Sequence, residues 1–263
     1  MIKMNNNGQN QKKQLLYLLI NSFLHVICCG LSFYFNNGNK FAATPSNALL
    51  EFFIIHWCVW NSVLTVIYNL REIRLLFQKT PLLSSEQEKQ RKFGLVIAVS
   101  NLTSLLGFTF ALPNLLGKNV LTSPIWRINS VVWHYLVLPM SLIYFFQFVK
   151  PKEFNYLKKK EIFRFILPLP AIFFLANLAR RFLLVNENYF EANNNVKLKK
   201  FMIWWFEHVE NKEYTWLLFW ITFSVFYFWL TACLLLKVKL KFFGSVSREK
   251  KLPLVLWNKQ KNA

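Results

Sequence analysis

Histidine, threonine and asparagine side chains lie inside long apolar stretches of this sequence, where each needs a partner, a cavity or a function. His134 is the first candidate, because an imidazole can take a proton from a hydroxyl or from water near neutral pH. Thr65 supplies a hydroxyl, and Asn61 supplies an amide that can steady a developing charge. We therefore assign candidate catalytic roles to these residues: His134 as base, Asn61 as its support and Thr65 as an alternative nucleophile.

Two adjacent arginines, Arg180 and Arg181, form a candidate anion-binding site. Paired guanidinium groups can hold a phosphate or a carboxylate. Arginines near the end of an apolar stretch also reach the interface simply by extending along it, so both interpretations stay open. His56, in the second apolar stretch, is a further candidate ligand-binding residue.

Several site types are excluded by residue usage. All twelve acidic residues are glutamate, so the chain has no Ser-His-Asp triad, aspartate dyad or EF-hand loop. His25, His56 and His134 could together hold zinc, but no HExxH or paired-histidine spacing supports this. We predict neither a metal nor a cofactor.

The elements that position these side chains are predicted to be membrane helices. The 263 residues are 54% hydrophobic and carry a net charge of +20, because long apolar blocks alternate with short basic ones. Six blocks can each cross a hydrocarbon core of roughly 30 Å, which needs about 20 helical residues. We predict an all-α fold, a single six-helix integral membrane domain with helices near 14–35, 48–68, 93–113, 129–149, 162–184 and 214–236.

The orientation follows from the lysines and arginines between the blocks. The N-terminus, the second and fourth connections and the tail 237–263 hold 22 of them, and the alternate connections hold seven. This bias predicts that both termini are cytoplasmic, in the plasma membrane. The positive charge therefore indicates topology and attraction to anionic membrane lipid rather than nucleic-acid binding, and a membrane-protein partner stays open.

The last outer connection, 185–213, carries Phe201, Trp204, Trp205 and Phe206 between lysines and glutamates. We expect an interfacial helix there, although a loop with belt aromatics is the alternative. In the fourth block, Ser130, His134 and Ser141 share one stripe that should face the bundle. Pro139 cannot donate a backbone hydrogen bond and should open this helix locally. These polar groups predict a cavity in the outer half of the bundle.

The fourth block, VVWHYLVLPMSLIYFF, has His134 followed by Val137, Leu138 and Pro139. This pattern resembles the androgen-induced and androgen-dependent-TFPI-regulating membrane protein family and its bacterial six-helix relatives of unknown function. The segment LANLARRFLLVNENYF looks like the arginine-containing fifth helix of the bacterial members. EFFIIHWCVWNSVL is similar to their second helix, with Asn61 at the asparagine position.

The resemblance implies hydrolysis of branched fatty-acid esters by a threonine of the second helix and the histidine of the fourth. His134 matches that histidine, but Ile54 and Trp57 stand where the threonine is expected. Two hypotheses follow. The chain is a hydrolase of lipid acyl esters with an outward- or lipid-facing polar pocket, or it is a non-enzymatic membrane subunit that binds or carries a small solute or lipid.

Overall fold

The computed structural model describes residues 6–35, 56–78, 84–116, 124–149, 159–183 and 214–243, and every regular element in these ranges is a helix. Each range overlaps one of the six apolar blocks. The elements are α1 (Asn6–Phe35), α3 (Trp57–Phe77), α4 (Ser84–Leu116), α5 (Pro124–Val132), the π-helical turn η2 (Trp133–Val137), α6 (Leu138–Gln147), α7 (Lys159–Ile166), α8 (Pro168–Leu183) and α12 (Tyr214–Phe243).

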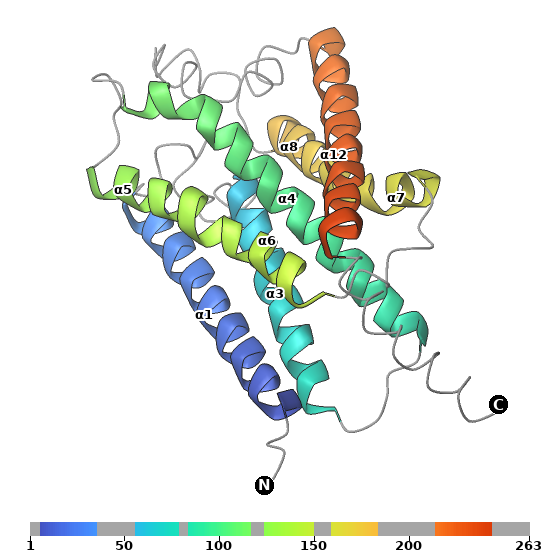
Figure 1. The fold of residues 1–263 in the computed structure, drawn as a ribbon. Helices are drawn as coiled ribbons and strands as arrows, with labels where there is room; N and C mark the ends of the chain where they lie inside the picture. Colours follow the sequence, from blue (N-terminus) through green and yellow to red (C-terminus); the bar gives the residue numbers. More distant parts are fainter. Residues whose placement is uncertain are drawn as a thin grey trace, which may run out of the picture.

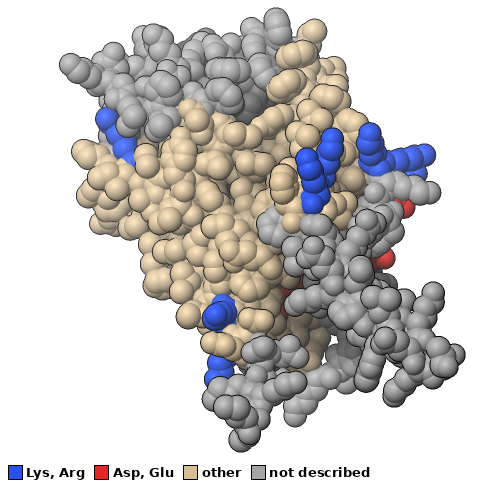
Figure 2. Space-filling view, in the orientation of Figure 1, with Lys and Arg blue, Asp and Glu red and all other residues tan. Residues whose placement is uncertain are grey.

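Four of these helices are long and apolar enough to cross a membrane. The spans are Gln9–Phe35, Glu88–Thr109, Pro124–Gln147 and Ile221–Phe242, the third of which runs through α5, η2 and α6. The outward faces of these helices expose many large apolar side chains. In the face shown in Figure 2, a broad uncharged surface lies between separate groups of lysine and arginine. The length and the apolar outer faces of these helices are consistent with a helical membrane protein.

The other two expected spans differ from their sequence-based bounds. The second was expected over 48–68, but α3 begins at Trp57 and continues to Phe77, so it includes the charged stretch 71–74. Residues 48–55 lie outside the described ranges. The fifth, expected over 162–184, is divided at Leu167 into α7 and α8. Pro168 explains this division, because a proline disfavours helical geometry at the residue before it.

Two further expectations concern the C-terminal third. The predicted interfacial helix in 185–213 lies outside the described residues. The basic tail was expected from residue 237, but α12 continues unbroken to Phe243, so the first turns of that tail are helical. Residues 244–263 are also outside the described ranges.

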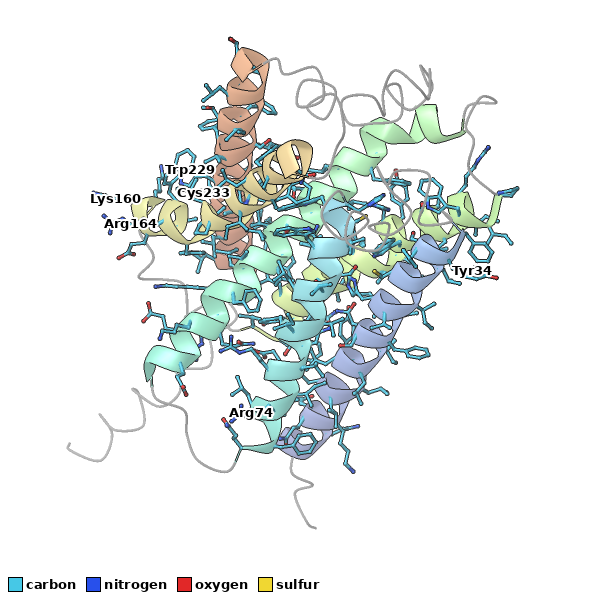
Figure 3. The ribbon with its side chains drawn as sticks, turned by 180° about the vertical axis from the view of Figure 1, so that it is seen from behind. Tyr34, Arg74, Lys160, Arg164, Trp229 and Cys233 are labelled. Atoms are coloured by element: carbon cyan, nitrogen blue, oxygen red, sulfur yellow. The ribbon has the colours of Figure 1, made fainter. Side chains whose placement is uncertain are left out.

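Four helices form a bundle at the centre of the molecule. Both α1 and α4 pack against α3 and against the α5–η2–α6 helix, so α1 and α4 face each other diagonally (Figure 1). On the outside of α4, α12 packs together with α7 and α8. Figure 3 places Tyr34 of α1 and Arg74 of α3 at opposite ends of the bundle, as the antiparallel course of these helices requires.

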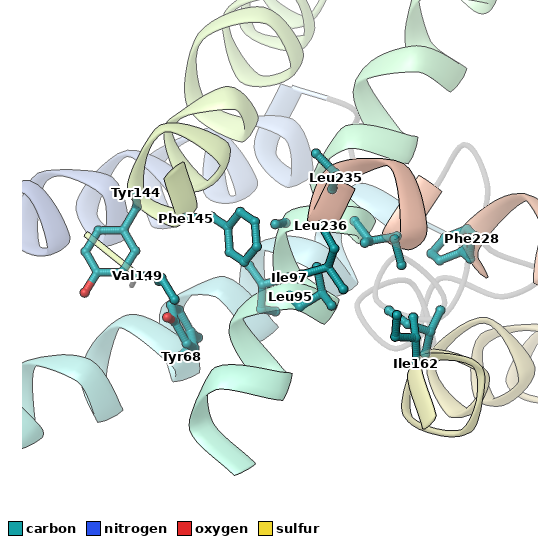
Figure 4. Close-up of a cluster of buried hydrophobic side chains, with 14 of the residues drawn as sticks. Tyr68, Leu95, Ile97, Tyr144, Phe145, Val149, Ile162, Phe228, Leu235 and Leu236 are labelled. Carbon is teal, nitrogen blue, oxygen red and sulfur yellow. The ribbon is translucent and has the colours of Figure 1, made fainter. Parts of the chain in front are cut away.

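A large apolar cluster joins the bundle to α12. It contains residues of α3, α4, α6, α7 and α12, several of them aromatic (Figure 4). Lys239 of α12 is fully buried beside this cluster, and its ammonium donates to the carbonyls of Phe145 and Phe146. These carbonyls belong to the last turn of α6, where carbonyls lack helical partners. Lys239 therefore caps α6 and fixes α12 against the bundle.

Candidate functional site

The α5–η2–α6 helix, which corresponds to the fourth apolar block, widens into a π-helical turn at Trp133–Val137. The backbone N–H of Leu138 donates to the carbonyl of Trp133, five residues back. Pro139 follows directly and has no N–H for the carbonyl of Tyr135, four residues back. The local opening expected near Pro139 is thus present as a wider turn, and such turns often occur at functional sites.

His134 lies in this widened turn. Its ring stacks on Phe108 of α4, with centroids 3.9 Å apart and planes 11° apart. Its Nδ1 is 2.8 Å from the Ser130 carbonyl, and because a carbonyl only accepts, Nδ1 carries the proton. His134, Ser130 and Ser141 are all at least nine-tenths buried, so the polar stripe of the fourth span does face the bundle.

Asn61 and Thr65 connect α3 to α4 rather than to His134. The Asn61 amide donates to the Ser100 carbonyl at 3.0 Å and to the Ser104 hydroxyl, and it accepts from the Ser100 hydroxyl. Thr65 accepts from the Asn101 amide at 3.1 Å. Within the described residues, the Ser130 carbonyl is the only hydrogen-bond partner of His134. No hydrogen bond there brings the three candidate catalytic residues together.

A different histidine is paired with a hydroxyl. His25 Nδ1 lies 2.8 Å from Ser62 Oγ, and Trp133 Nε1 donates to the same oxygen at 3.0 Å. Because an indole only donates, Ser62 Oγ accepts from Trp133, and the hydroxyl keeps one proton and one lone pair with which to pair with His25. His25 and Ser62 are 0% and 2% exposed, so this pair connects helices inside the bundle and is closed to a lipid substrate.

The three candidate ligand-binding residues lie elsewhere. His56 is the residue before α3, with extended backbone, and is half-buried. Arg180 and Arg181 belong to the final turn of α8, but their side chains are outside the described part of the structure. The anion site therefore stays a prediction. In the described ranges no three His, Cys, Asp or Glu residues are grouped as metal ligands would be.

The register of α4 against α6 is fixed by the stacked pair Phe108 and His134. The two helices are antiparallel, so two turns along, Asn101 of α4 lies at the level of Ser141 of α6. Both side chains are buried, at 0% and 6% exposure. The register of α4 against α6 therefore places one polar residue of each of these two helices, Asn101 and Ser141, in the middle part of the bundle.

The register of α1 against α3 is fixed by the His25–Ser62 bond. One turn along these antiparallel helices, Asn21 of α1 lies at the level of Thr65 of α3, and both are fully buried. The Asn101–Thr65 bond places both helix pairs at the same level. Asn21, Thr65 and Asn101 thus lie near one level of the bundle, and Ser141 lies about one turn nearer the N-terminus of α1, where Tyr17 donates to the carbonyl of Met140. We call these four buried residues the polar ring: Asn21, Thr65, Asn101 and Ser141.

Within the described part of the chain, the polar ring contains buried polar atoms that have no hydrogen-bond partner. Leaving such an atom unpaired costs about 1–3 kcal/mol, so each one requires an explanation, such as a bound molecule. The unpartnered atoms of the ring are Asn21 Nδ2, Asn21 Oδ1, Asn101 Oδ1 and Ser141 Oγ. They include donors and acceptors, and the ring has no charged member.

Polar contacts continue along the bundle axis on both sides of the ring. At the far end of α1, Asn129 donates to the Cys28 carbonyl at 2.9 Å and to Ser32 at 3.1 Å. Towards the N-terminus of α1, Gln14 donates to Tyr144 at 2.6 Å. From residue 14 to residue 32 the helix rises ~27 Å, close to the thickness of a hydrocarbon core. Polar groups therefore line the bundle over almost a whole membrane thickness.

Glu72 lies at the Gln14 end of this axis, a position that the sequence did not indicate. Tyr144 donates to its carboxylate at 2.9 Å, and Tyr68 and Gln90 also hydrogen-bond to it. The sequence places Glu72 in a connection because hydropathy falls after residue 68, whereas α3 continues for nine more residues. The one available signal was that Tyr68 and Glu72 lie four residues apart, on one helical face.

No protein-family model, curated protein or solved structure matches this chain. The likeness of the fourth block to the androgen-induced family therefore rests on the sequence motifs alone. What the site can do must be argued from its own chemistry.

Proposed function

We propose that this membrane protein binds a small uncharged polar solute at the polar ring and carries it through the four-helix bundle. The observation that supports the proposal is the set of unpartnered atoms on Asn21, Asn101 and Ser141. Polar side chains inside membrane helices are costly and commonly mark a substrate path. A solute that both donates and accepts hydrogen bonds, with the size of water or urea, satisfies this ring.

The chemistry around His134 favours carriage over ester hydrolysis. A nucleophilic mechanism needs a hydroxyl within hydrogen-bond reach of the base. Among the described residues His134 bonds to a carbonyl of its own helix and stacks on Phe108. A histidine–hydroxyl pair that the bundle does hold, His25 with Ser62, is closed off from lipid by burial.

The proposal includes an orientation. With 22 basic residues on one side, we propose that the chain lies in the plasma membrane with both termini cytoplasmic. The end of the bundle that holds Gln14 and Glu72 then faces the cytoplasm, and the end that holds Ser32 and Asn129 faces outward. Membrane lipid contacts the apolar outer faces.

The test is solute permeation into vesicles that contain the purified protein, followed by stopped-flow light scattering with water, urea and glycerol as probes. We compare the wild type with Asn21→Leu, which fills the ring with an apolar side chain of similar size. The matched control is Asn177→Leu, the same change at a fully buried position of α8.

We expect at least one probe to enter wild-type and Asn177→Leu vesicles faster than Asn21→Leu vesicles. Equal rates for all three probes in the wild type and Asn21→Leu would refute carriage through the ring. Parallel loss in both variants would show a general defect in folding and would also count against the proposal.

A further inference from the structure

The short helix α7 packs across α12 on the outside of the bundle. Ile162 and Ile166 of α7 are buried in the large apolar cluster together with residues of α12. Trp229 of α12 donates from Nε1 to the Lys159 carbonyl at 3.1 Å, and its ring meets that of Phe163 edge-on. These contacts fix the first turn of α7 against the middle of α12.

Exposed basic side chains gather where these two helices meet. They are Lys159, Lys160 and Arg164 of α7 and Lys237 of α12, which we call the basic corner. Cys233 lies one turn before Lys237 on the same face of α12, and it interacts electrostatically with Lys159. Lys159 and Lys237 therefore lie on the same side of the contact between the helices. Figure 3 shows Lys160 and Arg164 at the outer edge of α7.

The four cations of the basic corner form no ion pair with any carboxylate in the described ranges. Nearby on α4, by contrast, Lys92 pairs with Glu88 at 2.5 Å and lies over the ring of Phe165. Glu161 is the single carboxylate of α7, so the corner keeps an excess of positive charge. Like charges repel more strongly beside hydrocarbon than in water, and an anionic group among them offsets that repulsion.

An exposed apolar stripe of α12 leads into the basic corner. Lys237 and then Lys241 continue this stripe at its C-terminal end. From Phe226 to Lys237 the helix rises ~17 Å, close to the ~15 Å of hydrocarbon in one leaflet. The stripe thus matches one phospholipid, apolar beside the acyl chains and cationic beside the headgroup. Its apolar members are 41% to 53% exposed and recur every three or four residues: Phe223, Phe226, Leu230 and Leu234.

We propose that α7 and α12 bind an anionic phospholipid, with its phosphate between Lys159 and Lys237 and an acyl chain along Leu234 and Leu230. Lys160 and Arg164 add to the positive field around the headgroup. A zwitterionic phospholipid binds less tightly, because these cations repel the positive group that it also carries. The partner is therefore a phospholipid with a net negative charge, such as phosphatidylglycerol.

The basic corner is separate from the polar ring. It lies on the outside of the bundle, whereas the ring residues are buried between α1, α3, α4 and α6. Lipid binding does not require that the ring carries a solute, and it can be measured without any transport. Failure of either proposal leaves the other standing.

The first test is native mass spectrometry of the full purified chain, titrated with phosphatidylglycerol or with phosphatidylcholine. We compare the wild type with Lys159→Gln/Lys237→Gln. The matched control is Lys12→Gln/Lys13→Gln, which removes the same charge from two exposed positions of α1 on the same side of the membrane in the proposed orientation.

We expect the wild type and the control to bind the first phosphatidylglycerol more tightly than phosphatidylcholine. Lys159→Gln/Lys237→Gln should bind it roughly 30-fold more weakly, the effect of two lysines at an anionic membrane surface. Equal affinities for the two lipids in the wild type, or equal losses in the two double variants, would overturn the site. Lys159→Arg/Lys237→Arg keeps the charge and should bind like the wild type, and a loss there as well would also count against it.

The acyl-chain contact has its own test. Leu234→Ala should weaken binding of phosphatidylglycerol, whereas Leu16→Ala, at a similarly exposed position of α1, should not. Soluble glycerol phosphate should bind far more weakly than the lipid, because it lacks the chain. Equal binding of glycerol phosphate, or no effect of Leu234→Ala, would show a site for free anions and would overturn the lipid as its partner.

Discussion

Gly94 offers a sharp test of how α3 and α4 pack beside Glu72. A Cβ atom at this position would lie 2.7 Å from the hydroxyl oxygen of Tyr68 and 3.0 Å from its Cζ. Distances this short force the ring to move, and Tyr68 is 4% exposed and in contact with Glu72. Gly107 lies on the same helix with nothing within 4 Å of its added Cβ, so it is the matched control.

The magnitude follows from two opposing effects. Replacing a helical glycine by alanine gains about 1 kcal/mol of helix propensity, and both variants share this gain. Overpacking a filled core costs about 1–3 kcal/mol, and only Gly94→Ala incurs it. We therefore expect Gly107→Ala to be more stable than the wild type, and Gly94→Ala to be less stable than Gly107→Ala by about 1–3 kcal/mol.

The assay is unfolding of the purified chain in mixed micelles by titration with SDS, followed by tryptophan fluorescence. The double variant Gly94→Ala/Tyr68→Phe removes the oxygen nearest to the new methyl group and should recover part of the loss. Equal midpoints for Gly94→Ala and Gly107→Ala would refute the tight approach of Tyr68 to α4.

Two other predictions concern the cap of α6 and the orientation of the chain in the membrane. Lys239→Met keeps an apolar stem of similar length but removes the ammonium that caps α6, so it should lose about 1.5–3 kcal/mol in the same SDS titration. Lys237→Met, at an exposed position one half-turn earlier, should be near neutral, and an equal loss in both would contradict the capping role. Cysteines placed at Thr80 and Asn155 should react with an impermeant maleimide only from the cytoplasmic side, and a cysteine at Asn195 only from outside. The reverse pattern would invert the proposed orientation.

The number and order of the helical segments could be predicted because hydropathy over twenty residues depends on composition alone. The ends could not. Hydropathy falls at Arg71, but α3 continues through it because Glu72 finds partners on two neighbouring helices, Tyr144 of α6 and Gln90 of α4. Conversely, the mean hydropathy over 162–184 does not reveal the break at Leu167, although Pro168 and Pro170 indicate a break there.

The candidate site could be predicted only in part. The sequence indicated that the stripe of Ser130, His134 and Ser141 would face the bundle, since polar groups in apolar helices turn inward, and all three are buried. It could not show which of them meet. Whether Thr65 faces His134 or Asn101 depends on the register between helices joined by long connections, and only the packed structure sets that register.

The widened turn at Trp133–Val137 also has a geometric consequence for the fourth span. Asn129, Trp133, Val137, Ser141 and Phe145 recur every four residues, and all five are buried. An ideal α-helix repeats every 3.6 residues, so positions four apart drift ~40° per step and would turn ~160° away over this stretch. The π turn winds more loosely and takes back much of that drift. Deleting one residue of the turn would restore regular α-helical winding. Residues before the turn, such as Asn129, would then rotate relative to residues after it, such as Ser141, and the two could no longer face the bundle together.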